Sequence, residues 1–288
     1  MTDEKPKFDA ARYKQTTFQQ WESAAEAWHR WGPLLSRWLG APTETMLDMA
    51  GVGQGSHVLD VAAGGGDQTM LVARRVGPSG RVLATDLSPS ILEFAAARAR
   101  EAGFDNVSTR ELDGEELARL EAGSFDVAIS RLGMIYFPDQ QRALAGMRHA
   151  LKEGGRVAAM VYSTAEKNGF FSIPVSVIRR RARLPPPLPG QPGPFSLGGE
   201  GVLGGAFLEA GFKEVEVRVV EAPLVVASAA ECLRFEEESF GALHQMLSGL
   251  SEEEREEAWQ EIEERLSEFQ TDEGFRGPCE LVIAVGAR

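Results

Sequence analysis

A short apolar run that ends in a glycine-rich turn is the part of this chain best suited to bind a ligand. The run, Val58–Asp67 (VLDVAAGGGD), carries an acidic residue, Asp60, followed by small residues at Ala62, Gly64 and Gly66. Small residues in such a turn let the backbone approach a ligand closely. The same glycines could also make a tight turn and nothing more, so the surrounding sequence has to decide.

The spacing of these small residues distinguishes two classes of nucleotide cofactor. A dinucleotide fingerprint, GxGxxG, needs glycine at positions 62, 64 and 67, and this chain has Ala62 and Asp67 at two of them. The pattern instead resembles motif I of class I S-adenosylmethionine-dependent methyltransferases. Their cofactor has no phosphate above the turn, so an acidic side chain is tolerated, and Asp60 can attract the cofactor's ammonium directly or through water.

Two further acidic positions follow the next predicted strands. Asp86, with Leu87 after it, ends the second strand, where a carboxylate can accept hydrogen bonds from both ribose hydroxyls. In the segment LDGEEL, Asp113 can accept from the adenine amino group, while backbone N–H groups near Gly114 and Glu115 reach the adenine ring. An acidic residue at position 86 is shared with nicotinamide enzymes, and Asp113 also suits a helix N-cap, so neither decides the cofactor alone.

The fourth predicted strand runs into the segment SRLGMIYFPD. It leaves Ser130, Arg131, Met134 and Tyr136 at the carboxyl edge of the sheet, where open α/β sheets bind ligands. We expect Ser130 and Arg131 to contact the cofactor, and Met134 and Tyr136 to line the acceptor pocket.

Several motifs occur in the order typical of one methyltransferase branch. VLDVAAGGGD, ATDLS, SFDVAISRLGMIYFPD and LKEGGR follow one another, and PFSLGGEGVLGGAFLEAGFKEVEV comes later. In these motifs the chain resembles the UbiE/COQ5-like (type 11) branch. Ala62 replaces the first motif glycine, a mild change that quinone methyltransferases of this branch commonly carry. The resemblance implies S-adenosylmethionine as cofactor and a small, hydrophobic or aromatic acceptor.

The elements that position these motifs follow an alternating β/α pattern from Ser56 to Ser163. Strands are predicted at 57–62, 81–86, 107–112, 126–131 and 156–162, and helices at 67–76, 90–103 and 139–155. Ser88 and Pro89 suit the start of the second helix, and Gly103 suits its end. The pattern predicts a Rossmann-like, mostly parallel sheet of seven strands with helices on both faces.

The whole chain divides into six predicted segments. A helix at 199–210 and a strand at 214–222 continue the core, the closing strand comes at 279–288, and a capping box at Ser251 and Glu254 begins one of the inserted helices. The expected segments are N-terminal cap helices at 1–50, the cofactor-binding core at 51–163, a linker or lid with a proline-rich strap at 164–198, the continued core at 199–228, a helical cap insertion at 229–272 and the final strand at 273–288.

Aromatic residues of the cap are the candidates for the acceptor pocket. Trp21, Trp28, Trp31 and Trp38 lie at near-helical spacing in one N-terminal window. They could form an aromatic wall over the cofactor cleft, with Trp28 and Trp31 beside the acceptor, or pack as ordinary core.

A general base, where the acceptor needs one, has three candidates. These are Tyr136, His29 and His244, because His57 begins a strand and His149 lies in a helix far from the site. The four histidines show no metal-ligand spacing, so no metal is expected.

An arginine cluster follows the apolar run NGFFSIPVSVI. Arg179, Arg180, Arg181 and Arg183 could recognise an anionic acceptor or a membrane surface. The other interpretation is the solvated end of a helix, where cations oppose the helix dipole favourably.

Composition narrows the class of partner. The net charge of −13 argues against nucleic acid, whose phosphates are bound by Lys and Arg. Cys232 and Cys279 make no disulfide framework, and the sequence has neither an export signal nor a membrane span, so a cytoplasmic location is expected. The oligomeric state is left open.

Together these features predict a methyltransferase that moves a methyl group to a small acceptor by in-line displacement, at an O, N, C or S atom. Two alternatives remain. One is an NAD(P)-dependent oxidoreductase, and the other is a protein that binds S-adenosylmethionine without catalysis.

Overall fold

The computed structural model describes residues 8–188 and 190–288, so residues 1–7 of the predicted cap and Pro189 of the predicted strap lie outside it. It confirms the predicted α/β class with a seven-stranded sheet of order β3-β2-β1-β4-β5-β10-β6. Only β10 runs antiparallel to its neighbours in this sheet. The strands are β1 His57–Val61, β2 Arg81–Asp86, β3 Val107–Glu111, β4 Phe125–Arg131, β5 Leu151–Tyr162, β6 Lys213–Glu221 and β10 Glu280–Ala287.

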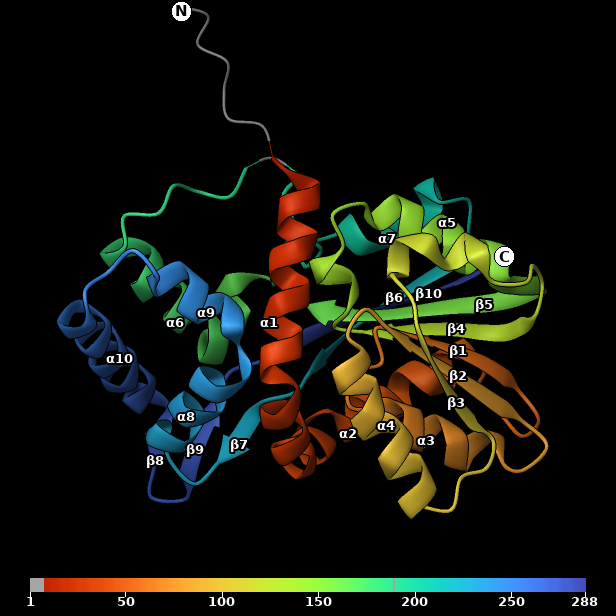
Figure 1. The fold of residues 1–288 in the computed structure, drawn as a ribbon, viewed down its shortest axis with the longest axis horizontal. Helices are drawn as coiled ribbons and strands as arrows, with labels where there is room; N and C mark the ends of the chain where they lie inside the picture. Colours follow the sequence, from red (N-terminus) through yellow and green to blue (C-terminus); the bar gives the residue numbers. More distant parts are fainter. Residues whose placement is uncertain (1–7, 189) are drawn as a thin grey trace, which may run out of the picture.

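Helices cover both faces of this sheet (Figure 1). One face is covered by α2 (Gly32–Ala50), α3 (Asp67–Val76) and α4 (Pro89–Glu101), and the other by α5 (Gln140–Ala150) and α7 (Val202–Glu209). The buried residues of β1 and β4, such as Val58, Leu59 and Ala128, are wholly covered, as expected of central parallel strands.

Local signals set the ends of the helices as predicted. Ser88 accepts a hydrogen bond from the Ile91 N–H at the start of α4, and Gly103 follows the helix with φ of +72°. The capping box at Ser251 and Glu254 is also present at the start of α10 (Glu252–Leu266).

The predicted helix at 139–155 ends earlier than expected. Its last residue is Ala150, and Leu151 already has extended backbone (φ −71°, ψ 146°) and pairs with Phe125 of β4. Gly154 adopts a left-handed φ of +75°, which a helix does not allow. The segment LKEGG therefore belongs to the long strand β5, and its helical periodicity was misleading.

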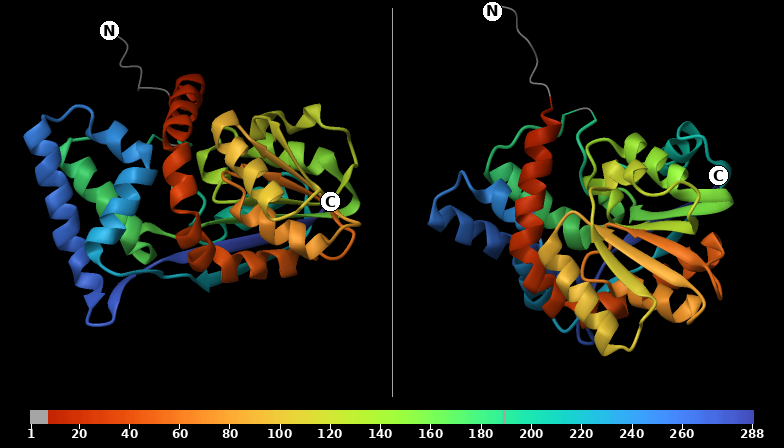
Figure 2. Two further views of the ribbon diagram at one scale, coloured as in Figure 1. Left: turned by 60° about the horizontal axis from the view of Figure 1, so that its bottom comes forward. Right: turned by 45° about the vertical axis from the view of Figure 1, so that its right-hand side comes forward.

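A helical cap stands beside the sheet. It contains α1 (Ala10–Arg30), α6 (Gly169–Arg181), α8 (Ala229–Ser239), α9 (Gly241–Leu247) and α10. Two further views show α1 between the sheet and the other cap helices (Figure 2). No described helix is long and apolar enough to cross a membrane.

The segment predicted as helical at 229–272 also contributes to a small second sheet. Strands β7 (Leu224–Val226), β8 (Gln270–Thr271) and β9 (Gly274–Gly277) form it, after the short helix η4 (Ser267–Phe269). Strands of two to four residues are too short for a period-two pattern to reveal them, so the helical prediction was wrong at its carboxyl end.

The arginine cluster ends α6, and two of its members join cap helices together. Arg181 forms ion pairs with Glu257 and Glu261 of α10, and Arg180 also pairs with Glu261. The cluster therefore lies at a helix end, as one interpretation held, and it connects α6 to α10. The described part of the proline-rich strap contains neither helix nor strand.

Candidate functional site

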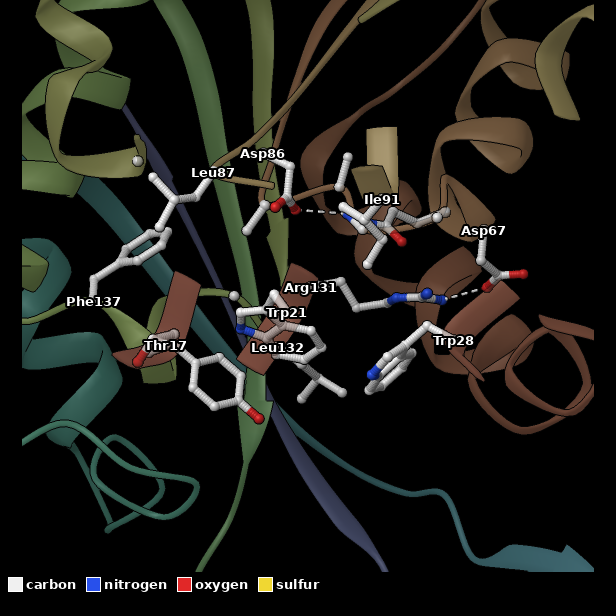
Figure 3. A pocket seen from close by; sticks show the side chains of 18 of the residues that line it. Thr17, Trp21, Trp28, Asp67, Asp86, Leu87, Ile91, Arg131, Leu132 and Phe137 are labelled. Atoms are coloured by element: carbon white, nitrogen blue, oxygen red, sulfur yellow. Dashed lines mark hydrogen bonds and ion pairs between the residues drawn. The ribbon is translucent and has the colours of Figure 1, made fainter. Parts of the chain in front are cut away.

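One cavity lies at the carboxyl edge of the sheet, beneath α1. Its walls are the loops that follow β1, β2, β3 and β4, together with residues of α1, α2 and the cap. The cavity and its mouth enclose about 1140 Å³, and much of its wall is apolar (Figure 3). This size and location suit a small-molecule site at the switch point of an open α/β sheet.

The glycine turn after β1 forms one wall in a strained conformation. Ala62 has a left-handed φ of +57°, and Gly64 and Gly66 have φ of +56° and +80°. A Cβ at Gly66 would lie 2.8 Å from that of Ala95, and a Cβ at Gly133 would lie 2.5 Å from that of Ala62. Ala62, Gly64 and the adjacent Gly65 line the cavity, while Gly66 lets α4 pack closely behind it.

Asp60 lies beneath the turn and does not reach the cavity wall. Its carboxylate accepts hydrogen bonds from Gln68 Nε2 at 3.1 Å and Thr69 Oγ1 at 2.6 Å. Burial raises the pKa of Asp60 to about 6. The structure therefore corrects the prediction of a direct contact with an ammonium group: Asp60 holds Gln68, and Gln68 lines the cavity.

Asp86 and Leu87 reach the cavity from the end of β2. The two oxygens of Asp86 accept from the N–H groups of Gly64 at 2.9 Å and Ser88 at 3.0 Å. Each carboxylate oxygen can accept a second hydrogen bond, so the half-buried side chain still has capacity toward a ligand. Desolvation raises the pKa of Asp86, although the N–H groups of Ser88, Gly64 and Leu87 oppose the shift.

The loop after β3 contains Asp113, Gly114 and Glu115. Asp113 does cap a helix, because it accepts from the Glu115 N–H at 2.9 Å, and it also accepts from Lys14 Nζ at 2.6 Å. Gly114 lines the cavity, and a Cβ there would lie 2.4 Å from the ring of Phe137.

Glu115 itself lies off the cavity. Its carboxylate accepts from Lys14 Nζ at 2.6 Å and from the Asp139 N–H at 2.8 Å. Its backbone N–H is already bonded to Asp113. The structure therefore corrects the prediction that this N–H is available to an adenine ring, and leaves Asp113 and Gly114 facing the cavity.

A buried charge network occupies the cavity wall near α3. Arg131 donates to Asp67 at 2.8 Å (Figure 3). It also donates to Thr43 at 3.1 Å, and Arg98 lies 3.6 Å from Asp67. Burial opposes ionisation of Asp67, but Arg131, the Ser36 hydroxyl and Arg98 together outweigh it and lower the pKa of that carboxyl. The neighbouring Ser130 is off the cavity wall, and its buried Oγ has no hydrogen-bond partner in the described structure.

Aromatic side chains form the other end of the cavity. Trp21 lies edge-on to Tyr136 with ring centroids 5.3 Å apart, and Trp28 lies edge-on to Phe240 at 5.7 Å. The indole N–H of Trp28 donates to the Ser239 carbonyl at 2.9 Å, which orients the ring. Trp21, Trp28, Tyr136 and Phe240 line the cavity together with Tyr162.

Two residues predicted for the acceptor pocket lie elsewhere. Trp31 donates its indole N–H to Glu238 at 2.7 Å and packs on Phe235, and Met134 is wholly buried in the core. Trp38 is also core, with its indole N–H bonded to the Ala222 carbonyl. Helical spacing could not separate Trp31 and Trp38 from the cavity wall, because both packing roles favour large apolar residues.

The two histidines proposed as bases are exposed and outside the cavity. His29 stacks on Phe94 at 4.4 Å, and His244 Nε2 lies 2.7 Å from the Glu237 carbonyl oxygen. Neither is a candidate base for a ligand in this cavity. Residues 8–188 and 190–288 also contain no cluster of His, Cys, Asp or Glu arranged to hold a metal.

Tyr136 does line the cavity, but its surroundings do not favour a base. Burial raises the pKa of Tyr136 well above its usual value, so its hydroxyl stays protonated and suits hydrogen-bond donation. This corrects the prediction of Tyr136 as a general base and leaves its predicted place in the cavity wall. Sequence reasoning missed other residues that line the cavity, namely Lys14, Thr17, Gln68, Arg98, Tyr162 and Phe240. Of these, only Tyr162 had a signal in the sequence, because it ends a predicted strand.

Comparison with known proteins identifies the family that the core resembles. Residues 41–174 match the profile of the ubiE/COQ5 methyltransferase family. A ubiquinone/menaquinone biosynthesis C-methyltransferase UbiE from Idiomarina loihiensis is 36% identical over 118 residues, which are 41% of this chain and 47% of that protein. The chain thus spans about half the length of the curated relatives it matches. The predicted resemblance is confirmed for this part of the chain.

Solved structures share the fold over most of the chain. The YcgJ protein from Bacillus subtilis has a TM-score of 0.55 at 18% identity, covering 86% of this chain and 98% of that one. The [4+2]-cyclase SpnF has a TM-score of 0.55 at 17% identity, covering 93% and 97%. At such identities the likeness establishes the Rossmann-like fold and leaves the reaction to the site.

Proposed function

We propose that this chain, whose residues 41–174 match the ubiE/COQ5 methyltransferase family, is an S-adenosylmethionine-dependent methyltransferase acting on a small, hydrophobic or aromatic acceptor. One observation carries the proposal: the loops after β1, β2 and β3 all meet in one cavity whose far end is aromatic. Such a cavity has a polar place for a nucleoside and an apolar place for an acceptor.

The polar end fits the cofactor by charge and by space. Asp86 has acceptor capacity for ribose hydroxyls, and Asp113 with the cradle at Gly114 suits the adenine. The amino-acid end of the cofactor is a zwitterion, so its ammonium and carboxylate match the opposite charges of Asp67 and Arg131 or Arg98.

The apolar end suits the chemistry of methyl transfer. When bound, S-adenosylmethionine supplies an electrophilic methyl group on a sulfonium. The chain's task is alignment, which can contribute roughly 7 to 11 kcal/mol to lowering a barrier. Trp21, Trp28 and Phe240 exclude water and orient a flat acceptor, and an apolar wall favours a reaction in which charge is neutralised.

The finer proposal concerns the atom that receives the methyl group. The relatives over the core are named ubiquinone/menaquinone biosynthesis C-methyltransferases. Their names support a ring carbon of a quinone-related molecule as the first acceptor to test. The aromatic end of the cavity supports a flat ring of this kind.

Ligand-induced stabilisation tests the cofactor. S-adenosylhomocysteine at about 100 times its Kd should stabilise the fold by roughly 2.7 kcal/mol, while NADH should leave the melting temperature unchanged. A shift with NADH alone would support the oxidoreductase instead.

Transfer of a labelled methyl group to a panel of aromatic acceptors tests catalysis. Label in a product supports the methyltransferase. Cofactor binding without transfer to any acceptor would favour a protein that binds S-adenosylmethionine without methylating, and the [4+2]-cyclase with the same fold makes this control necessary.

A further inference from the structure

The aromatic end of the cavity contains two tyrosine hydroxyls that no described residue hydrogen-bonds. Tyr162 is the last residue of β5, and Tyr136 ends the short helix η2 (Met134–Tyr136) after β4. The two strands are neighbours, and the Leu132 N–H donates to the Met160 carbonyl at 2.8 Å where they end. Both tyrosines therefore reach the same cavity from adjacent strand ends.

Tyr162 has a mostly apolar environment for a polar group. It is 2% exposed, and the rings of Phe170, Phe171 and Phe195 lie within 5.9–6.3 Å of its own. Its hydroxyl lies at the cavity wall, where water or a ligand atom can accept its hydrogen bond. A ligand that displaces this water without offering an acceptor leaves the hydroxyl unpaired, at a cost of about 1–3 kcal/mol.

Two neighbouring donors are already engaged. The Trp28 indole N–H is bonded to Ser239, and Nη1 of Arg131 is bonded to Asp67 and Thr43. Burial raises the pKa of Tyr162 as well as that of Tyr136, so both hydroxyls are protonated and available to donate. The partner that each hydroxyl requires is an atom with a lone pair, which accepts its hydrogen bond.

We propose that Tyr162, together with Tyr136, donates a hydrogen bond to an oxygen of the methyl acceptor. The acceptors are then aromatic rings that carry a hydroxyl or carbonyl oxygen. Tyr162 is a specificity-determining residue, because it distinguishes oxygen-bearing rings from plain hydrocarbons of the same shape. This inference rests on the proposed function.

The test compares 2-naphthol with naphthalene, a pair that differs by one hydroxyl. Binding is measured by quenching of tryptophan fluorescence in the presence of S-adenosylhomocysteine, for wild type, Tyr162→Phe and Tyr136→Phe. Tyr13→Phe is the matched control, because Tyr13 lies on α1 outside the cavity wall. We expect wild type to prefer 2-naphthol, and Tyr162→Phe to weaken 2-naphthol binding about three- to tenfold without changing naphthalene binding.

Several results would overturn the assignment. These are equal affinity of wild type for the two probes, no binding of 2-naphthol, or an equal loss in Tyr13→Phe. Unchanged S-adenosylhomocysteine binding shows that each variant is folded, and should Tyr162→Phe not fold, the same comparison in Tyr136→Phe decides. If S-adenosylhomocysteine binds but neither Tyr162→Phe nor Tyr136→Phe changes the affinity for 2-naphthol, only this inference fails. If S-adenosylhomocysteine does not bind wild type, the proposed function fails.

Discussion

The two ends of the cavity are built in different ways. The polar end consists of loops that follow β1, β2 and β3 in chain order, and backbone groups of Gly64 and Ser88 hold its main carboxylate. The aromatic end is made by side chains from separate parts of the chain, including Trp28 of α1, Tyr162 of β5 and Phe240 of the cap. Under the proposed function, local sequence forms the end that binds the cofactor, while contacts between distant segments form the end that selects the acceptor.

The largest effect expected on ligand binding comes from breaking the polar end. Asp86→Ala should weaken S-adenosylhomocysteine binding about 100-fold, since two hydrogen bonds to a charged group contribute roughly 1.5 kcal/mol each. Calorimetry measures the change, and Asp272→Ala, at an exposed position, is the control. Affinity equal to wild type would remove Asp86 from the cofactor site, and 2-naphthol binding should stay within twofold.

A buried acid of the cap, Glu236, contrasts with Asp86 of the polar end and should make the stability of the fold depend on pH. Glu236 is wholly buried, and its Oε2 has no partner in the described structure, unlike the well-bonded Asp86. Burial raises the pKa of Glu236 well above its ordinary value of 4.5, so the folded state keeps a proton that the unfolded state releases. Stability is therefore lost as the pH rises above about 4.5.

The variant Glu236→Gln removes this titration. Above pH 4.5, the unfolding free energy of the variant minus that of wild type should rise by up to about 1.4 kcal/mol per pH unit. Below pH 4.5 the two unfolding free energies should lie closer together. Urea unfolding between pH 4 and 8 measures the gap. Glu253→Gln, at an exposed position with no such burial, should show none, and a pH-independent gap for Glu236→Gln would contradict the assignment.

A smaller effect is expected from breaking the aromatic end. Trp28→Leu removes a ring packed on Phe235 and Phe240, and should weaken 2-naphthol binding up to about tenfold. S-adenosylhomocysteine binding should change little. Trp259→Leu is the matched control, because Trp259 is a partly buried tryptophan of α10 away from the cavity. Equal effects of both substitutions on 2-naphthol would mean that Trp28 acts through the fold alone.

The smallest effect concerns the helix that joins the two ends. Lys14 bonds Asp113 and Glu115, while Trp28 on the same helix lines the aromatic end of the cavity. Lys14→Met should lower the unfolding free energy by about 1 kcal/mol, because Lys14 is partly exposed while Glu115 is buried. Urea unfolding measures it against the exposed Lys167→Met. A loss no larger than that of the control would show that the pair contributes nothing.

Local patterns predicted most of the core. The α4 boundaries followed from Ser88, Pro89 and Gly103, and the positions of Asp86 and Gly114 on the cavity followed from their places after strands. Predictions failed where a residue's surroundings come from distant segments. Asp60 is turned to Gln68 and Thr69, and Glu115 is held by Lys14 of α1. No spacing within a strand or loop contains that information.

The sequence by itself determined the β/α order, the glycine-rich turn after β1, and the class of protein that the core resembles. These depend on backbone conformation and on residues close together in the chain. Only the tertiary structure decided that Trp28 rather than Trp31 faces the cavity, that His29 and His244 do not, and that Tyr162 does. Helix periodicity says which residues share a face, whereas packing against α8, β5 and the turn determines what that face meets.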